Sequence, residues 1–463
     1  MNGSAITNSQ IFFIDVKERL ISFARRIAMD KAVSYALLAR IWGFAAGPIT
    51  ALLIAIHFTP AIQGFYFTFG SILALQVFAE LGIGVAITQF ASHEWANLKI
   101  SEDGKVSGDP DSLSRLVSLA QIAVKWYSIA AVIIIVGLSI GGYVFFSQSS
   151  MQNVNWKLPW ASLCFFTGIN IFSVAVWSLL EGCNQVSNVY FYRFFQGLLG
   201  SLAAWCAILL GANLWTVSII PITGLLYAVI FLRRNYWEFF KSLLLIKSDG
   251  PRLNWLTDIL PFQWRIALSW VSGYFAFSFF TPVLFHYHGP VEAGKMGMTW
   301  SLAGAVSAIG GAWLLPRIPQ FGIMVAQKRY AEMDGLFWRL TLIVTGTTLF
   351  GAVVIWVLVF GLNYYNNFLA QRLLSPLPTA LFLTATVIQS ASLPMSIYMR
   401  AHKKEPLLYL SIIGGVLIGL STFLLGKYYS VLGMAVGYLM IYAIIFPMIV
   451  FVWQRFKKTW HAV

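Results

Sequence analysis

The sequence predicts an all-α polytopic membrane protein, and three observations support this prediction. Of its 463 residues, 59% are hydrophobic and only 10% are charged, whereas a soluble domain carries about 25% charged residues. Apolar stretches of about 20 residues, long enough to cross a bilayer as helices, recur along the chain. The two halves of the chain also repeat one layout. We therefore expect about 12 transmembrane helices in two six-helix lobes, related by a pseudo-two-fold axis along the membrane normal.

The predicted elements follow one another without a folded domain outside the membrane. Residues 1–35 include a basic amphipathic segment that we expect on the cytoplasmic membrane surface. The N-terminal lobe is 36–232, the cytoplasmic interfacial linker is 233–260, the C-terminal lobe is 261–453, and 454–463 is a basic cytoplasmic tail. The twelve predicted spans are 36–57, 65–89, 116–146, 159–180, 190–210, 214–232, 261–286, 296–316, 338–360, 377–399, 407–426 and 431–453.

Positive charge predicts the orientation of these spans. Of the 31 Lys and Arg residues, 24 fall in the termini and loops on the N-terminal side of the membrane and four in the loops on the other side. Cytoplasmic loops carry this excess of Lys and Arg, so both termini are expected in the cytoplasm. A net charge of +14 in such loops indicates topology and contact with anionic membrane lipids, and we expect no nucleic-acid partner.

An internal repeat relates the two halves. Arg40 opens the first span and Arg265 opens the seventh, 225 residues later, while the turn AIQGFY at 61–66 matches VEAGKM at 291–296 with an offset of 230. These similar offsets predict a duplication with small insertions, although two unrelated helical hairpins could also align this well. Six spans per half give both halves the same orientation, which suits alternating access to a cleft between them.

One carboxylate lies deep in the second predicted span. Glu80 has Gln76 four residues before it, with Gly84 and Thr88 following at the same spacing, and this spacing places all four on one face of a continuous helix. A charge at the centre of a membrane helix costs roughly 2.5–3.5 kcal/mol. We interpret Glu80 and Gln76 either as a site for a coupling proton or cation, or as a hydrogen bond between helices.

Three cations lie deepest within the predicted spans. Arg40 and Arg265 are each about four residues inside a span, and Lys125 lies in the third. Two arginines at matching places in facing bundles could hold a phosphate or pyrophosphate headgroup through bidentate hydrogen bonds, with Lys125 adding a third charge. Alternatively, the arginines reach back to the lipid headgroups and Lys125 is solvated.

Polar side chains also recur in the fourth and tenth spans. Asn170 aligns with Gln389 and Ser173 with Ser392 at an offset of 219. Such residues bond neighbouring helices for about 0.6 kcal/mol each. Their number and symmetry instead favour a polar lining of a wet cleft between the halves.

Several function classes lack their sequence signals. We find no nucleotide-binding loop and no metal-binding motif, and the three cysteines have no metal-ligand spacing. We therefore expect no cofactor, no metal and no catalytic residue. The short outer loops hold no acidic pair of the kind that a membrane glycosyltransferase or polymerase would need.

The stretch GFYFTFGSILALQVFAELGIGVAITQFASHEWA at 64–96 and the turn EGCNQVSNVYFYR at 181–193 resemble the second helix and the loop between helices four and five of the Wzx-type polysaccharide flippases. These belong to the multidrug/oligosaccharidyl-lipid/polysaccharide (MOP) exporter superfamily. The resemblance implies two six-helix lobes around a central cavity with cationic lining, where Arg40 and Arg265 match by place.

The resemblance also implies a function. The substrate would be an undecaprenyl-pyrophosphate-linked oligosaccharide, moved from the inner to the outer leaflet of the bacterial cytoplasmic membrane for surface polysaccharide biosynthesis. A polysaccharide polymerase and glycosyltransferases are the candidate protein partners. The main alternative is a cation-coupled antiporter for drugs or other small molecules in the same superfamily, which should need several buried carboxylates. A membrane polysaccharide polymerase is the remaining alternative.

Overall fold

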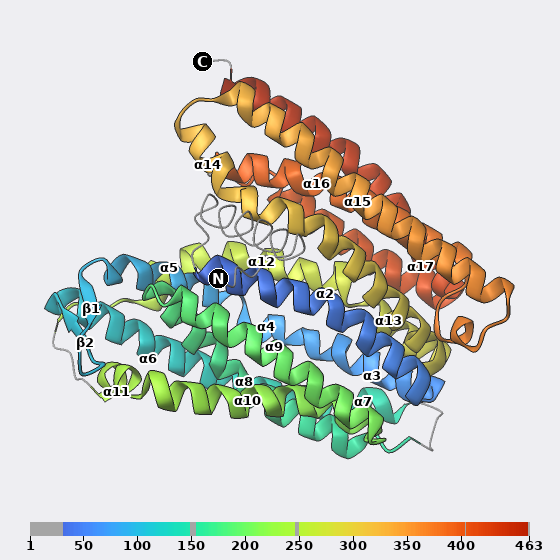
Figure 1. Cartoon of the computed structure of the whole chain (residues 1–463), viewed down its shortest axis with the longest axis horizontal. Coiled ribbons are helices and arrows are strands. Elements are labelled where there is room, and N and C mark those ends of the chain that lie inside the picture. Colours follow the sequence, from blue (N-terminus) through green and yellow to red (C-terminus); the bar gives the residue numbers. More distant parts are fainter. Residues whose placement is uncertain (1–30, 149–153, 246–249, 403, 462–463) are drawn as a thin grey trace, which may run out of the picture.

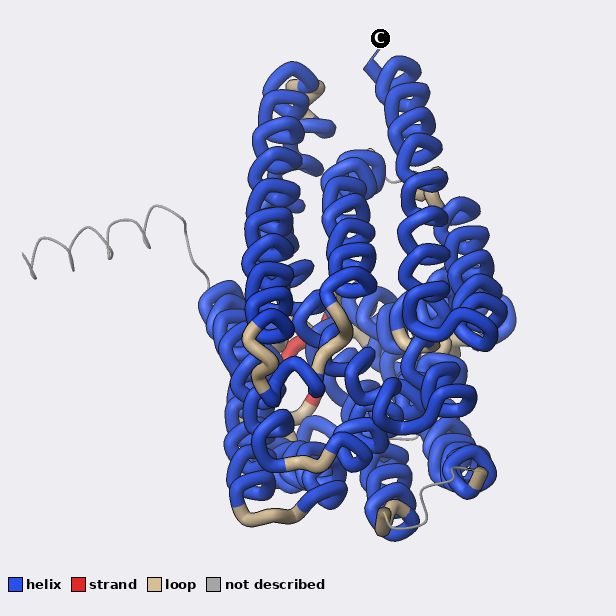
Figure 2. The backbone as a smooth tube through the Cα atoms, turned by 90° about the vertical axis from the view of Figure 1, so that its right-hand side faces the viewer, coloured by secondary structure: helices blue, strands red, loops and turns tan. Residues whose placement is uncertain are grey.

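The computed structural model describes residues 31–148, 154–245, 250–402 and 404–461. Most of the predicted N-terminal amphipathic segment, part of the linker and the last two residues of the tail lie outside these ranges. Helices dominate the described chain, and its two short strands are the red segments of Figure 2. By length and composition, nine helices of the described chain could cross a membrane. The predicted helical, multi-pass membrane protein is thereby confirmed.

The N-terminal half, blue to green in Figure 1, contains the helices α2 to α11 and a β-hairpin. Its elements are α2 (Lys31–His57), α3 (Pro60–Leu73), η1 (Ala74–Gln76), α4 (Val77–Glu80), α5 (Ile83–Trp95), β1 (Leu98–Ile100), β2 (Val106–Gly108), α6 (Pro110–Val132), the π-helix η2 (Ile133–Leu138), α7 (Ser139–Ser147), α8 (Lys157–Gly182), α9 (Val186–Leu209), η3 (Asn213–Trp215), α10 (Thr216–Asn235) and α11 (Trp237–Leu245). We call the end of the molecule with the strands and α11 the hairpin end.

The C-terminal half, yellow to red in Figure 1, occupies the adjacent region. It comprises the π-helix η4 (Trp255–Ile259), α12 (Leu260–Phe277), α13 (Phe280–Leu314), η5 (Leu315–Arg317), α14 (Ile318–Ala326), α15 (Tyr330–Tyr364), η6 (Phe368–Arg372), α16 (Pro376–Ala401) and α17 (Leu408–His461). Two of its helices contain a kink with a positive φ angle, at Gly289 (85°) in α13 and at Ser430 (55°) in α17. Each of these long helices therefore consists of two shorter ones.

The second predicted span, 65–89, is not the continuous helix that we expected. Leu81 and Gly82 have φ angles of 48° and 68°, and they separate α4 from α5. Leu81 caps α4 in the left-handed conformation, and Gly82, which has no Cβ, adopts the same conformation without steric cost. Consequently Gln76 and Glu80 do not share one helical face with Gly84 and Thr88. Leucine and glycine are common inside membrane helices, so the apolar pattern did not reveal this break.

The two halves make their most extensive contact between α3 and α13, at the end of the molecule opposite the hairpin. A Cβ atom added to Gly64 would lie 1.9 Å from the carbonyl oxygen of Pro290, and one added to Gly294 would lie 2.9 Å from the backbone nitrogen of Gly64. Gln63 adds two hydrogen bonds of 2.9 Å, to the carbonyl oxygens of Gly294 and Arg372. The sequence aligned Gly64 with Gly294, and these two residues meet in the structure.

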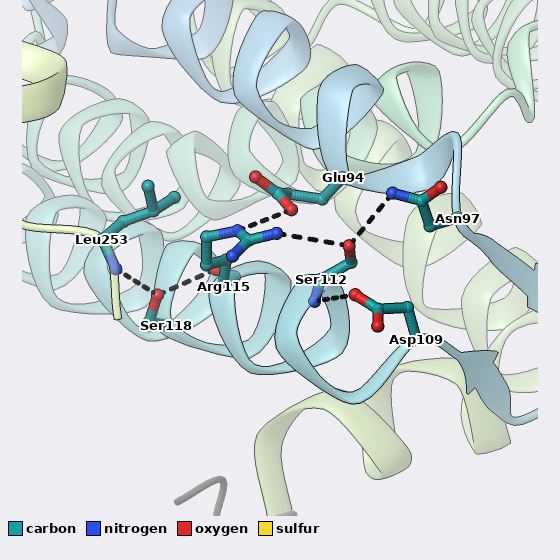
Figure 3. A network of polar contacts seen from close by, with 7 residues as sticks. All are labelled: Glu94, Asn97, Asp109, Ser112, Arg115, Ser118 and Leu253. Atoms are coloured by element: carbon teal, nitrogen blue, oxygen red, sulfur yellow. Dashed lines mark hydrogen bonds and ion pairs between the residues drawn. The ribbon is translucent and has the colours of Figure 1, made fainter. Parts of the chain in front are cut away.

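The linker between the halves packs on the N-terminal half. At the hairpin end, Arg115 pairs with Glu94 at 2.8 Å and donates a hydrogen bond to Ser112 (Figure 3). On the next turn of α6, the Ser118 hydroxyl accepts a hydrogen bond of 3.0 Å from the backbone N–H of Leu253. This bond anchors the linker shortly before η4 and α12.

Candidate functional site

A cavity of about 590 Å³ lies inside the N-terminal half. Its walls come from α2, α3, η1, α8, α9 and α10. The spacing of its lining residues on α8 (Leu163, Thr167 and Asn170) follows one helical face. The polar residues of the lining are Thr50, Gln76, Thr167, Asn170, Arg193, Gln196 and Ser201. No acidic side chain is among the described residues that line this cavity.

Two tryptophans donate hydrogen bonds to hydroxyl groups between α2 and α9. Trp205 Nε1 donates to Thr50 Oγ1 at 2.8 Å, and Trp42 Nε1 donates to Ser201 Oγ at 2.9 Å. The two indole rings lie 5.8 Å apart. Because an indole N–H needs a partner in an apolar surrounding, these bonds fix the wall formed by α2 and α9.

Two other polar atoms of the cavity have no partner within the described part of the chain. Thr167 Oγ1 and Asn170 Oδ1 are buried atoms without a hydrogen bond among the described residues. The side chains of Asn170 and Gln196 converge on Gly224, where an added Cβ would lie 3.4 Å from Asn170 Nδ2 and 2.7 Å from Gln196 Nε2. Buried polar atoms are normally hydrogen-bonded. Both atoms are enclosed, so this wall can bind a polar ligand or ordered water once the two side chains turn toward the cavity.

Arg193 supplies the positive charge of the cavity, on the side nearest the hairpin end. Its Nη2 lies 2.7 Å from Glu181 Oε1, with side-chain exposures of 42% for Arg193 and 20% for Glu181. The guanidinium also lies over the ring of Tyr190, 5.4 Å from its centre. Arg193 therefore lines the cavity while paired with a carboxylate at the end of α8.

The three cations that the sequence singled out lie elsewhere. Arg40 is exposed on α2, on the face opposite Trp42. Lys125 is exposed on α6. Arg265 is exposed on α12, with its guanidinium 5.6 Å from the centre of the Trp264 ring. None of the three lines the cavity of the N-terminal half.

Glu80 is half-buried at the helix break between α4 and α5. The buried Tyr127 hydroxyl lies within electrostatic range of its carboxylate. The break itself contacts the C-terminal half, since Gln263 Nε2 donates to the carbonyl oxygen of Leu81 at 3.4 Å. Gln76 lines the cavity, whereas Glu80 does not.

A second cavity, of about 350 Å³, lies between α12, α16 and α17 in the C-terminal half. Gln389 and Ser392 line it, and Arg265 lies one turn before another lining residue, Ser269. Asn170 and its aligned counterpart Gln389 therefore face different cavities, one in each half. Ser173 is half-buried on α8 and lines neither cavity.

Sequence reasoning missed Arg193 and Gln196. Arg193 falls in the stretch 181–193 that carried the family resemblance, but it was interpreted only as a loop charge. The spacing of Arg193, Gln196, Gly197 and Gly200 on one helical face was an available signal. Across the ranges that the structure describes, no group of three or more His, Cys, Asp or Glu side chains could hold a metal ion.

The fold and its cavities define the class of protein: a multi-pass helical membrane protein with a largely apolar cavity that carries a few polar groups in one half and a second cavity in the other. Several solved structures share this fold. One is a ligand complex of the MATE multidrug transporter DinF-BH, with a TM-score of 0.62 and 12% identity, covering 94% of this chain and 96% of that one.

Two further structures are similar. An inward-facing multidrug resistance MATE family transporter of the MOP superfamily has a TM-score of 0.58 and 14% identity, covering 93% of this chain and 96% of its own. The lipid II flippase MurJ, in an inward closed conformation, has a TM-score of 0.53 and 14% identity, covering 91% and 87%. These similarities establish the fold.

No family profile matches the sequence, and no curated protein is similar to it.

Proposed function

We propose that the protein is a flippase of the MOP type, which moves a lipid-linked oligosaccharide across the membrane by alternating access. Its bundle would have twelve spans in two lobes, because Gly289 and Ser430 divide two of the nine candidate spans and α9 adds one more. The proposed setting is the bacterial inner membrane with both termini cytoplasmic, so that the hairpin end faces the cytoplasm. The substrate is an oligosaccharide on undecaprenyl pyrophosphate, for surface polysaccharide biosynthesis.

The observation that supports this proposal is the chemistry of the cavity in the N-terminal half. Its unpartnered groups are an amide oxygen and a hydroxyl, at Asn170 and Thr167, with the amide of Gln196 beside them. Amides both donate and accept hydrogen bonds, so they suit the many hydroxyl groups of a sugar. The only charged side chain in the described lining is Arg193. This combination favours a ligand with a large uncharged polar part and one anionic group.

Each part of the substrate would then have its own binding environment. The sugars would bind the amide wall, the phosphate groups would approach Arg193, and the polyprenyl tail would remain in the lipid. Keeping the tail in the bilayer avoids exposing its apolar surface to water. Glycosyltransferases that build the oligosaccharide, and a polymerase that extends it, are the proposed protein partners.

The second candidate is a cation-coupled multidrug antiporter. Two observations favour it: two similar structures are of multidrug transporters, and Glu80 is a half-buried carboxylate in a transmembrane helix. Against it, a cationic drug in the N-terminal cavity would meet Arg193 and no acidic lining residue. The described lining therefore offers a cation no counter-charge, since Glu181 already pairs with Arg193.

Transport assays with the purified full-length chain in proteoliposomes test the proposal. We expect flipping of an undecaprenyl-pyrophosphate-linked oligosaccharide, and no accumulation of the lipophilic cation tetraphenylphosphonium. Asn170→Leu removes the amide at similar volume and should lower the flipping rate about five- to tenfold, because about one net hydrogen bond is lost. Ser173→Ala, on the same helix but outside the cavity, is the matched control and should leave the rate unchanged.

Two results would contradict the proposal. Cation transport without flipping would establish the antiporter instead. Equal flipping rates in wild type and Asn170→Leu, at equal protein incorporation, would show that the sugar does not bind the amide wall.

A further inference from the structure

The Arg193–Glu181 ion pair joins the cavity to the end of α8. Glu181 follows Asn170 by 11 residues on α8, and at about 100° per residue the two side chains project within about 20° of one another. Arg193 lies on the cavity face of α9. Its guanidinium therefore lies between the amide wall, where we place the sugar, and a carboxylate outside the cavity lining.

We propose that Glu181 competes with the anionic group of the substrate for Arg193. In the empty protein Glu181 neutralises the guanidinium. When a lipid-linked phosphate or pyrophosphate arrives, it replaces Glu181 on Arg193, and the carboxylate turns away. This inference rests on the proposed function, and it assigns the phosphate end of the substrate to one arginine of this chain.

Electrostatics explains why such a competitor is useful. An arginine without a counter-charge is costly among transmembrane helices, and the side chain of Arg193 is only 42% exposed. Glu181 supplies the counter-charge in the substrate-free protein. A phosphate group presents several anionic oxygens to the planar guanidinium and can bond in the bidentate manner that arginine favours. It therefore displaces a single carboxylate, whereas a neutral sugar does not.

The competitor also makes the site selective. A cationic ligand gains nothing from displacing Glu181, because it would then face the freed guanidinium. An anion gains Arg193 and releases Glu181, whose side chain is 20% exposed at the end of α8. The ion pair thus selects anionic over cationic ligands, and the amide wall then binds the sugar.

The alternative is that the ion pair has only a structural role and holds α8 against α9. The two roles predict opposite effects for Glu181→Gln. If the pair is only structural, the variant loses stability and binds no more tightly. If Glu181 competes with the ligand, the variant binds the anion more tightly, because the freed Arg193 no longer needs to break a bond.

Binding measurements with the full chain in phosphatidylcholine nanodiscs distinguish these roles, with undecaprenyl pyrophosphate as the probe. We expect Glu181→Gln to lower the Kd about two- to fivefold, the strength of a partly exposed ion pair. Arg193→Gln should raise the Kd at least tenfold, and the double variant should behave like Arg193→Gln. Glu181→Asp, with a shorter side chain, should lie between wild type and Glu181→Gln.

Glu94→Gln is the matched control. It removes the same charge from another arginine pair, the 2.8 Å pair with Arg115 at the hairpin end, and should leave the Kd unchanged. Unchanged or weaker binding in folded Glu181→Gln overturns the competition, even if wild type flips the oligosaccharide. Tighter binding in Glu181→Gln, with no flipping by wild type, would instead retain the competition and refute the proposed function. Failure of every variant to bind the probe also overturns the inference.

Discussion

Replacing Gly64 by alanine should loosen the contact between the two halves. The added Cβ would lie 1.9 Å from the carbonyl oxygen of Pro290. Real Cβ atoms essentially never approach another heavy atom closer than 3.0 Å. The backbones of α3 and α13 must therefore separate by at least about 1.1 Å, the difference between these two distances. The clash is with backbone, so no side-chain rotation relieves it.

The magnitude follows from two opposing effects. Alanine is more favourable than glycine inside a helix by roughly 0.5–1 kcal/mol, so a loosely packed site would gain stability. Overpacking a tight contact costs typically 1–3 kcal/mol. If the strain is relieved when the halves separate here, the ratio of separated to closed protein should rise about five- to 150-fold.

Spin-label distances measure this shift directly. Labels at Leu210→Cys and Tyr365→Cys, both strongly exposed, report the separation of the halves after the exposed Cys206 is replaced by serine. We expect a longer distance population and a lower Tm in Gly64→Ala. Gly70→Ala is the matched control on the same helix, since no atom lies within 4 Å of its added Cβ. The reasoning is refuted if Gly64→Ala and Gly70→Ala have the same distance distribution and the same Tm.

Two further predictions concern the C-terminal half. Asp334 accepts a hydrogen bond of 2.7 Å from the Tyr398 hydroxyl and pairs with Lys457 at 2.7 Å. Asp334→Ala should therefore lower the free energy of unfolding by about 1.5–3 kcal/mol in denaturant titrations. An unchanged midpoint of the titration would contradict this prediction. Burial lowers the pKa of His402 below its usual 6.5, and its ring stacks on Trp460 at 4.3 Å. Because the folded pKa is the lower one, the unfolded chain binds more protons. Stability should therefore fall as the pH drops from about 6.5 to the folded pKa of His402, and His402→Phe should make Tm less dependent on pH over that range.

The apolar periodicity of the sequence was sufficient to predict a helical multi-pass protein, because backbone groups in lipid must bond within their own helix. It could not locate the break at Leu81 and Gly82, since these residue types are compatible with a membrane helix until the backbone conformation is known. The helix break also separated Glu80 from the face that its spacing had predicted. Local sequence specified the span but not its internal geometry.

The candidate site was harder to predict, because its walls come from six elements of the N-terminal half. Spacing along one helix identified Asn170 and Gln76 as polar residues of spans. It did not reveal that both face a chamber within one half, or that Arg193 lies there too. The matching positions of Arg40 and Arg265 predicted a shared anion site, but both side chains are exposed and neither lines the cavity of the N-terminal half. The direction in which a helix turns its charges depends on its neighbours, which a single sequence does not specify.

The anchored linker limits how far the molecule can open. Leu253 is held on α6 by Ser118, and α12 begins at Leu260, so seven residue steps connect a fixed point on one half to the first helix of the other. Even with η4 pulled straight, seven steps reach on the order of 25 Å. At the hairpin end, the start of α12 therefore cannot move farther than this from Leu253. The separation of α12 from α6 at this end thus has an upper bound that is set by the length of the chain between them.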